Sequence, residues 1–156
     1  MINAHIRDSC RRFGLDYALV NALIATESGF NPCVIRYEPD YKWLYKIEEC
    51  RRLLGCTLDT MINMQKTSWG LGQIMGAVAY EMGLKNWATK LLDPEMNIHF
   101  VCEYLKNIID KHRPKDQKEV YAIYNAGSLR YKSNGDLVNQ ANVDRFMIKL
   151  TIVQKI

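Results

Sequence analysis

The sequence lacks the marks of several protein classes. Its five cysteines include no C-x-x-C pair, and their odd number argues against a complete disulfide framework or a zinc site. The longest nearly apolar stretch, Tyr17 to Ala25, is far shorter than the ~20 residues that a membrane-spanning helix needs. With 48% hydrophobic and 24% charged residues, the composition excludes disordered and collagen-like chains. We therefore expect a globular chain with free thiols, without a metal site and without membrane insertion.

The N-terminal residues contain no apolar segment of the kind that signal peptides have. We expect synthesis in a cytoplasm, where the thiols stay reduced. The net charge of +4 favours an anionic polymer as partner, either nucleic acid or the bacterial cell wall. No dense Lys/Arg run or nucleic-acid-binding motif is present, so nucleic-acid binding is the weakest hypothesis. The length predicts a single domain over residues 1–156, which we expect to be monomeric.

Apolar spacing and end signals predict a mainly α-helical fold. A first helix over residues 2–13 would end at Gly14, and Asp16 would cap a second helix over residues 17–28. The second helix is apolar on nearly every face, which is typical of a central buried helix. Further helices are predicted at residues 73–82, 94–109, 117–124 and 143–153. Asp93 followed by Pro94 marks the start of the second of these, and Asp116 with Glu119 resembles a capping box at the start of the third. No convincing strand pattern appears beyond a short hairpin near residues 128–137.

Three polar clusters are candidates for chemistry. Glu27 lies at the C-terminal end of the apolar second helix, where burial and the helix dipole both favour a protonated carboxyl group. Gln73, in the glycine-rich residues 67–75, offers an amide suited to sugar hydroxyls. Tyr124 and Asn125 end a later helix. Taken singly, each cluster has an ordinary structural explanation: a solvent-facing helix end, a glycine turn, and a core tyrosine with a helix-stopping asparagine.

Together and in this order, the clusters resemble the soluble lytic transglycosylase family, which cleaves the glycan strands of peptidoglycan. The family's Glu-Ser and Asn-Pro pairs are matched by Glu27-Ser28-Gly29-Phe30-Asn31-Pro32. Its Gly-Leu-Met-Gln-Ile segment is matched by Gly70-Leu71-Gly72-Gln73-Ile74, and its Ala-Tyr-Asn-Ala-Gly by Ile123-Tyr124-Asn125-Ala126-Gly127. Residues 92–98 resemble the stretch before the family's long helix, so the resemblance covers residues 4–150. It implies a lysozyme-like helical domain of the goose-type kind.

The chain departs from the family pattern at three places. Ile123 replaces the usual alanine before the tyrosine. Gly72 replaces the usual methionine, which predicts a more open cleft floor. Residues 36–66 form an insertion that resembles one in phage and phage-like members. Its aromatic residues Tyr37, Tyr41 and Trp43 are expected to line the cleft and stack on sugar rings, or else to form a small hydrophobic cluster. The lack of a signal peptide, the free cysteines and the small size suit a phage product, either an endolysin or a virion-associated enzyme, and a bacterial enzyme exported by a dedicated machine is the alternative.

The resemblance also implies a mechanism that needs no metal or cofactor. Glu27 would protonate the glycosidic oxygen between N-acetylmuramic acid (MurNAc) and N-acetylglucosamine (GlcNAc), then accept a proton from the muramic C6 hydroxyl, leaving a 1,6-anhydro end. Tyr124 would hydrogen-bond or orient Glu27, while Gln73 and Asn125 would line the cleft. Further residues expected at the same wall are Ser68, Gly70 and Met75.

Two alternatives share the same motifs. A goose-type lysozyme would use water and a second carboxylate, about 6.5–9.5 Å from the first in an inverting enzyme. Its candidates are Glu38, Asp40 and Asp59, which the sequence does not place relative to Glu27. A non-catalytic wall-binding virion module is the other alternative, and the presence of Glu27, Gln73 and Tyr124 argues against it.

Overall fold

The computed structural model describes residues 1–155, and its first two helices begin and end where local signals predict. Helix α1 (Ile2–Phe13) ends at Gly14, which adopts the left-handed φ of 66°. Helix α2 (Tyr17–Glu27) is capped by Asp16, whose carboxylate accepts a hydrogen bond from the Ala18 N–H at 2.9 Å. Residues 19–24 are all buried, and α2 packs on the C-terminal helix α8 (Gln140–Val153). The expected central buried helix is therefore confirmed.

The two helices between α2 and α8 that carry site residues also begin at predicted caps. Helix α6 (Pro94–His112) starts after Asp93, which accepts from the Met96 N–H. Helix α7 (Gln117–Ala126) starts after Asp116, which accepts from the Glu119 N–H at 2.9 Å. The Glu119 carboxylate accepts a hydrogen bond from the Lys115 N–H at 2.8 Å. Asp116 and Glu119 thus act like a capping box, in which both side chains bind free backbone amides at the helix start.

A small antiparallel sheet, which the sequence did not predict, lies between the helices. Strands β1 (Ile35–Tyr37), β2 (Thr67–Trp69) and β3 (Ile74–Met75) pair in that order. Strands of two or three residues are too short to show an alternating pattern. Because Ile74 and Met75 belong to β3, helix α5 (Gly76–Glu81) is shorter than the predicted helix over residues 73–82.

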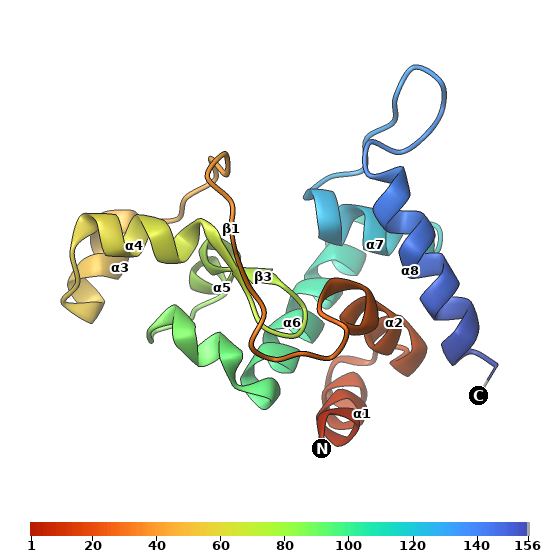
Figure 1. Ribbon diagram of the computed structural model, residues 1–156, viewed down its shortest axis with the longest axis horizontal. Helices are drawn as coiled ribbons and strands as arrows, with labels where there is room; N and C mark the ends of the chain where they lie inside the picture. Colours follow the sequence, from red (N-terminus) through yellow and green to blue (C-terminus); the bar gives the residue numbers. More distant parts are fainter. Residues whose placement is uncertain (156) are drawn as a thin grey trace.

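The insertion contains two helices, α3 (Ile47–Leu54) and α4 (Leu58–Gln65), where the sequence showed only an uneven polar pattern. Both are half as long as α6, and Cys50, Met61 and Met64 are their buried apolar residues. The predicted hairpin at residues 128–137 is a single bridge between Tyr131 and Leu137, at the base of a loop that projects from the molecule (Figure 1).

Figure 1 shows how these elements are arranged. Helices α3, α4 and α5 lie on one side of the sheet, and α7 and α8 form the opposite side of the molecule. A 3-10 helix (Ala88–Leu92) leads into α6, which contacts α1 and α7. None of the helices within residues 1–155 has the length and apolar character that crossing a membrane requires.

Candidate active site

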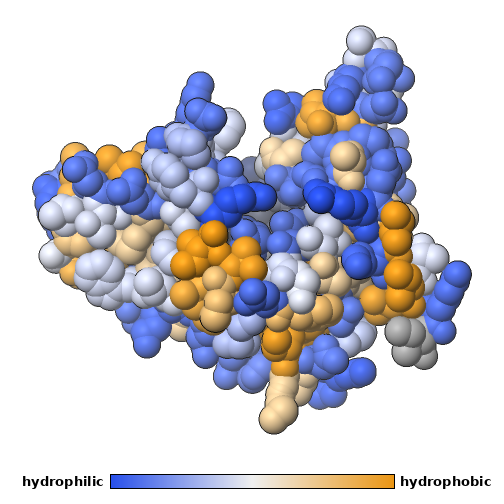
Figure 2. Space-filling view, viewed as in Figure 1, coloured by the Kyte–Doolittle hydropathy of each residue, from blue (hydrophilic) through white to orange (hydrophobic). Residues whose placement is uncertain are grey.

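A cleft of about 1140 Å³ separates the two sides of the molecule. Its walls come from β1 and the residues after it, from residues 68–75, from α5 and α6, and from the end of α7. Figure 2 shows the surface hollowed at this place, with strongly hydrophilic residues on both sides. Glu27 lines the cleft, as do Gln73, Tyr124 and Asn125, so the three predicted clusters meet in one place.

Glu27 is the last residue of α2 and is partly buried. Its Oε1 accepts a hydrogen bond from the hydroxyl group of Tyr121 at 2.7 Å. The Tyr121 ring stacks on Phe146 of α8, with 4.4 Å between ring centroids and 3° between ring planes. Both aromatic residues are almost fully buried, so α7 and α8 together fix the donor that holds the Glu27 carboxyl group.

Burial raises the pKa of Glu27 above its ordinary value. The hydrogen bond from Tyr121, the positive charge of Arg36, the Asn125 amide and the charge of Arg145 all lower this pKa, but the effect of burial is larger. Burial likewise raises the pKa of Tyr121, so its hydroxyl group keeps its proton and remains a donor. The carboxyl group is therefore protonated to a higher pH than a solvent-exposed glutamate, as a general acid requires.

Tyr124 does not make the predicted hydrogen bond to Glu27. Its hydroxyl group donates to the Gly72 carbonyl oxygen at 2.7 Å, while Tyr121, three residues earlier on the same face of α7, donates to Glu27. Tyr124 still lines the cleft, packed against Tyr104 with 5.3 Å between ring centroids. Tyr121 was not among the residues predicted from the sequence, because the family motif covers only Tyr124. The spacing of the two tyrosines by three residues, which places them on one face of a helix, is the signal that could have found it.

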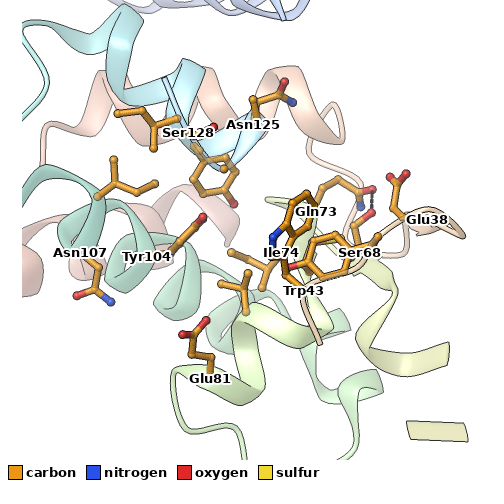
Figure 3. Close-up of a pocket in the computed structure, with 18 of the residues that line it drawn as sticks. Glu38, Trp43, Ser68, Gln73, Ile74, Glu81, Tyr104, Asn107, Asn125 and Ser128 are labelled. Carbon is orange, nitrogen blue, oxygen red and sulfur yellow. Dashed lines mark hydrogen bonds between the residues drawn. The ribbon is translucent and has the colours of Figure 1, made fainter. Parts of the chain in front are cut away.

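Hydrogen bonds to nearby residues fix the side chain of Gln73 at the cleft wall. Its amide nitrogen donates to the Val34 and Gly70 carbonyl oxygens at 3.0 and 2.9 Å, and its Oε1 accepts from the Ser68 hydroxyl group at 3.0 Å (Figure 3). These bonds stabilise a backbone φ of 51° at Gln73, which a non-glycine residue rarely adopts. With both N–H groups engaged, Gln73 presents an acceptor to a ligand.

Asn125 ties the end of α7 to α8. Its Oδ1 accepts from the amide groups of Asn139 and Asn142, at 2.9 and 3.0 Å, which leaves its own N–H groups for other partners. Ser68 and Met75 also line the cleft. Gly70 does not line it: Gly70 is buried with φ 69°, and a Cβ there would lie 2.4 Å from the Leu91 carbonyl oxygen.

Two of the three aromatic residues proposed from the insertion reach the cleft. Tyr41 and Trp43 line it and pack edge to face, with 5.4 Å between ring centroids, and Trp43 is 73% exposed. Tyr37 does not line it, because Arg36 of the same strand faces the cleft and adjacent strand residues point to opposite faces. The segment is anchored by the buried Gln65, whose amide bonds the Tyr45 N–H and carbonyl group, both at 2.7 Å.

The comparison with known families agrees with this geometry. The model of the transglycosylase SLT domain matches residues 5–146, which is nearly the whole chain. The chain belongs to the transglycosylase SLT domain family. It is therefore an enzyme, a peptidoglycan lytic transglycosylase, with a lysozyme-like helical fold. No solved structure matches the chain significantly.

The SLT domain carries other carboxylates near Glu27. Glu38 and Asp40 line the same cleft, and Glu38 is ion-paired with Arg36, whereas Asp59 lies on α4, exposed and outside the cleft. Among residues 1–155, no three His, Cys, Asp or Glu side chains gather as a metal site would require. The side chains that line the cleft include carboxyl, hydroxyl and amide groups.

Gly72 does not open the cleft floor of the SLT domain, contrary to the prediction. The residue is buried, and a Cβ there would lie 2.2 Å from Cγ2 of Val101 and 3.0 Å from the Tyr124 hydroxyl oxygen. Its N–H donates to Asn97 Oδ1 at 2.9 Å. Val101 and Tyr124 therefore occupy the space into which a side chain at this position would extend.

Proposed function

We propose that this transglycosylase cleaves the β-1,4 bond between MurNAc and GlcNAc with Glu27 as its single acid and base. The observation that carries the proposal is a partly buried carboxyl group in the cleft, with a raised pKa and a hydrogen bond from Tyr121. A carboxyl group that keeps its proton to a higher pH than an exposed glutamate can donate that proton to the leaving glycosidic oxygen.

The reaction balances without a cofactor. Glu27 transfers its proton to the glycosidic oxygen as the bond to C1 of MurNAc breaks through an oxocarbenium-like transition state. The C6 hydroxyl oxygen of the same sugar bonds to C1, and its proton passes to the Glu27 carboxylate. The acid is restored, no water is consumed, and the product ends in 1,6-anhydroMurNAc. The attack is intramolecular, which gives the C6 hydroxyl group a large advantage over bulk nucleophiles.

The neighbouring polar residues have supporting roles in this proposal. Tyr121 is a positioning residue that holds one carboxyl oxygen while the other faces the sugar. Gln73 presents an acceptor, and Asn125 presents amide donors, to hydroxyl and acetamido groups. Trp43, exposed at the cleft, offers a ring face for stacking on a sugar.

A hydrolytic outcome is a second candidate, because Glu38 and Asp40 line the cleft. Either carboxylate could deprotonate a water molecule on the opposite side of the sugar from Glu27. The ion pair with Arg36 engages one oxygen of Glu38. We favour the transglycosylase outcome because none of the matched motifs includes either carboxylate.

Mass spectrometry of muropeptides after digestion of purified peptidoglycan tests the two outcomes. We expect ends lighter by one water than hydrolysis products and unreactive to borohydride. The same products from Glu38→Gln and Asp40→Asn would confirm that neither carboxylate activates water. Reducing ends from the wild-type enzyme, lost in one of these variants, would overturn the proposal and establish a lysozyme.

A further inference from the structure

Three arginines lie at the walls and rim of the cleft that contains Glu27, and two of them, Arg36 and Arg145, act electrostatically on Glu27. Arg36 of β1 and Arg130 of the loop after α7 line the cleft directly. Arg145 of α8 reaches its rim through a hydrogen bond to Asn142, which lines the cleft. The three side chains come from elements on both sides of the hollow, where Figure 2 shows strongly hydrophilic surface.

Most of this positive charge has no counterion. Within residues 1–155, neither Arg130 nor Arg145 has a carboxylate within 4 Å, and Arg145 bonds only the neutral amide of Asn142. Arg36 donates from Nε to Glu38, and its two terminal amino groups have no partner among the same residues. The three guanidinium groups are solvent-exposed and are therefore available to a ligand.

The acidic side chains of the cleft are distributed differently. Glu81 and Glu103 belong to α5 and α6, and Figure 3 shows Glu81 and Asn107 at the opposite end of the cleft from Glu38. Glu38 is engaged by Arg36. Asp40 is the other carboxylate of the β1 side that lines the cleft. Arg36 therefore shares the β1 side of the cleft with Glu38 and Asp40, whereas Arg130 and Arg145 come from the side of α7 and α8.

This charge is unfavourable for acid catalysis on a neutral substrate. Arg36 and Arg145 both lower the pKa of Glu27 and so weaken its hold on the proton that it must donate. Hydroxyl and amide groups could bind a neutral glycan as well as guanidinium groups could. An anionic substrate gains charge-assisted hydrogen bonds, because guanidinium and carboxylate groups match in geometry and charge.

We propose that Arg36, Arg130 and Arg145 form a carboxylate-binding rim that recognises the anionic substituent of MurNAc beside the scissile bond. The inference rests on the proposed function, since it needs the reacting sugar at Glu27. The carboxylate has two possible sources. Peptide-free strands carry it on the lactyl group of MurNAc, and peptide-bearing strands carry it on the second residue of the stem, a D-glutamate.

Binding measurements by isothermal titration calorimetry test the rim. The probes are the peptide-free tetrasaccharide (GlcNAc–MurNAc)2, the same tetrasaccharide with an L-Ala-D-Glu stem, its counterpart with both glutamate carboxyl groups amidated, and neutral chitotetraose. Each is titrated into the Glu27→Gln protein, which prevents turnover, and into the same protein with Arg36→Gln, Arg130→Gln or Arg145→Gln. Lys149→Gln, which removes an exposed charge one turn along α8 from Arg145, is the matched control.

We expect Arg145→Gln and Arg130→Gln to weaken binding of a carboxylate probe about threefold to tenfold each, as for exposed charge pairs. Chitotetraose binding should not change, and Lys149→Gln should affect no probe. Loss confined to the peptide-free tetrasaccharide assigns the lactyl carboxylate. Loss with the L-Ala-D-Glu stem but not with its fully amidated counterpart assigns the stem carboxylate. Thermal unfolding of each variant checks that the fold is retained.

Equal losses with chitotetraose would overturn the proposal, because the arginines would then be general sugar contacts. Unchanged binding of every probe in all three variants would overturn it as well. The failure of the proposed function is a separate result: reducing ends from the wild-type enzyme would exclude the transglycosylase reaction, whereas charge-selective binding would still be measured in the Glu27→Gln background.

Discussion

At the scale of single residues, Glu27 is subject to opposing influences on its ionisation. Burial disfavours the carboxylate, while Tyr121 and the nearby arginines favour it. Because the pKa in the folded state is raised above the unfolded value, the ionised carboxylate lowers the free energy of unfolding at pH values above that pKa. Below the unfolded pKa both states are protonated, and this cost is absent.

We therefore predict that Glu27→Gln lowers wall-lysis activity by about 10²- to 10⁴-fold, the range attributed to a general acid. The melting temperature at pH 7 should stay equal to the wild-type value or rise, and any gain should shrink as the pH falls toward 4. Turbidity clearing and thermal unfolding at several pH values measure both effects. Glu49→Gln, an exposed position on α3, is the control. Retention of more than a few per cent of activity would contradict the assignment.

The two tyrosines of α7 give a matched pair of hydroxyl deletions. Tyr121→Phe removes the hydrogen bond that lowers the pKa of Glu27, so this pKa should rise and the alkaline limb of the pH–rate profile should move to higher pH. We expect kcat to fall as well, because the carboxyl group loses its anchor, while the stacking on Phe146 remains.

Tyr124→Phe instead leaves the buried Gly72 carbonyl group without its donor. It should lower the free energy of unfolding by about 1–3 kcal/mol and leave the alkaline limb where it is. Denaturant unfolding and pH–rate profiles of the two variants make the comparison. A shifted limb in Tyr124→Phe, with none in Tyr121→Phe, would show that the roles are reversed.

At the scale of elements, the insertion places the exposed ring of Trp43 in the cleft, on a segment that Gln65 anchors. Trp43→Ala should weaken glycan binding about threefold to tenfold, because a stacking face is lost, with little change in stability since Trp43 is 73% exposed. Tyr37→Ala is the matched control, an exposed aromatic residue of the same insertion that does not line the cleft. Titration with chitotetraose measures both variants, and equal losses would refute the role of Trp43.

The turn between β2 and β3 is packed against α6 so closely that it tolerates no side chain at Gly72. Gly72→Ala should lower the free energy of unfolding by about 1–3 kcal/mol, because its Cβ would overlap Cγ2 of Val101. Adding Val101→Ala should recover part of this loss, giving a favourable coupling in a double-mutant cycle measured by denaturant unfolding. Strictly additive effects would mean that the two residues do not compete for the space.

The elements also show which parts of the fold could be predicted from the sequence. Gly14, Asp16, Asp93 and Asp116 mark helix ends through contacts within a few residues, so their helices could be predicted. The sheet could not, because its short strands are defined by pairing partners such as Ile35 and Trp69, which are far apart in the chain.

The same distinction holds in the site. Glu27 could be predicted from its place in an apolar helix and from the family resemblance. Which tyrosine reaches it depends on how α7 is rotated against α2, a rotation fixed by the stacking of Tyr121 on Phe146. The exclusion of Tyr37 depends on a strand that the sequence did not reveal.

At the scale of the whole molecule, the five cysteines are free thiols that differ in exposure. Cys10, Cys50 and Cys102 are buried, Cys56 is partly buried and Cys33 is exposed. We predict that a thiol reagent labels Cys33 rapidly, Cys56 slowly and all five only after denaturation, and that a reductant leaves the melting temperature unchanged. Fewer than five thiols under denaturing conditions would contradict this prediction.

The stacking of Tyr121 on Phe146 has a consequence for the biosynthesis of the enzyme. Phe146 belongs to α8, which follows α2 and α7 in the chain and also covers α2, the helix that carries Glu27. Until α8 leaves the ribosome, Tyr121 has no stacking partner and the buried face of α2 stays uncovered. The nascent chain therefore cannot position its catalytic acid before α8 has been synthesised.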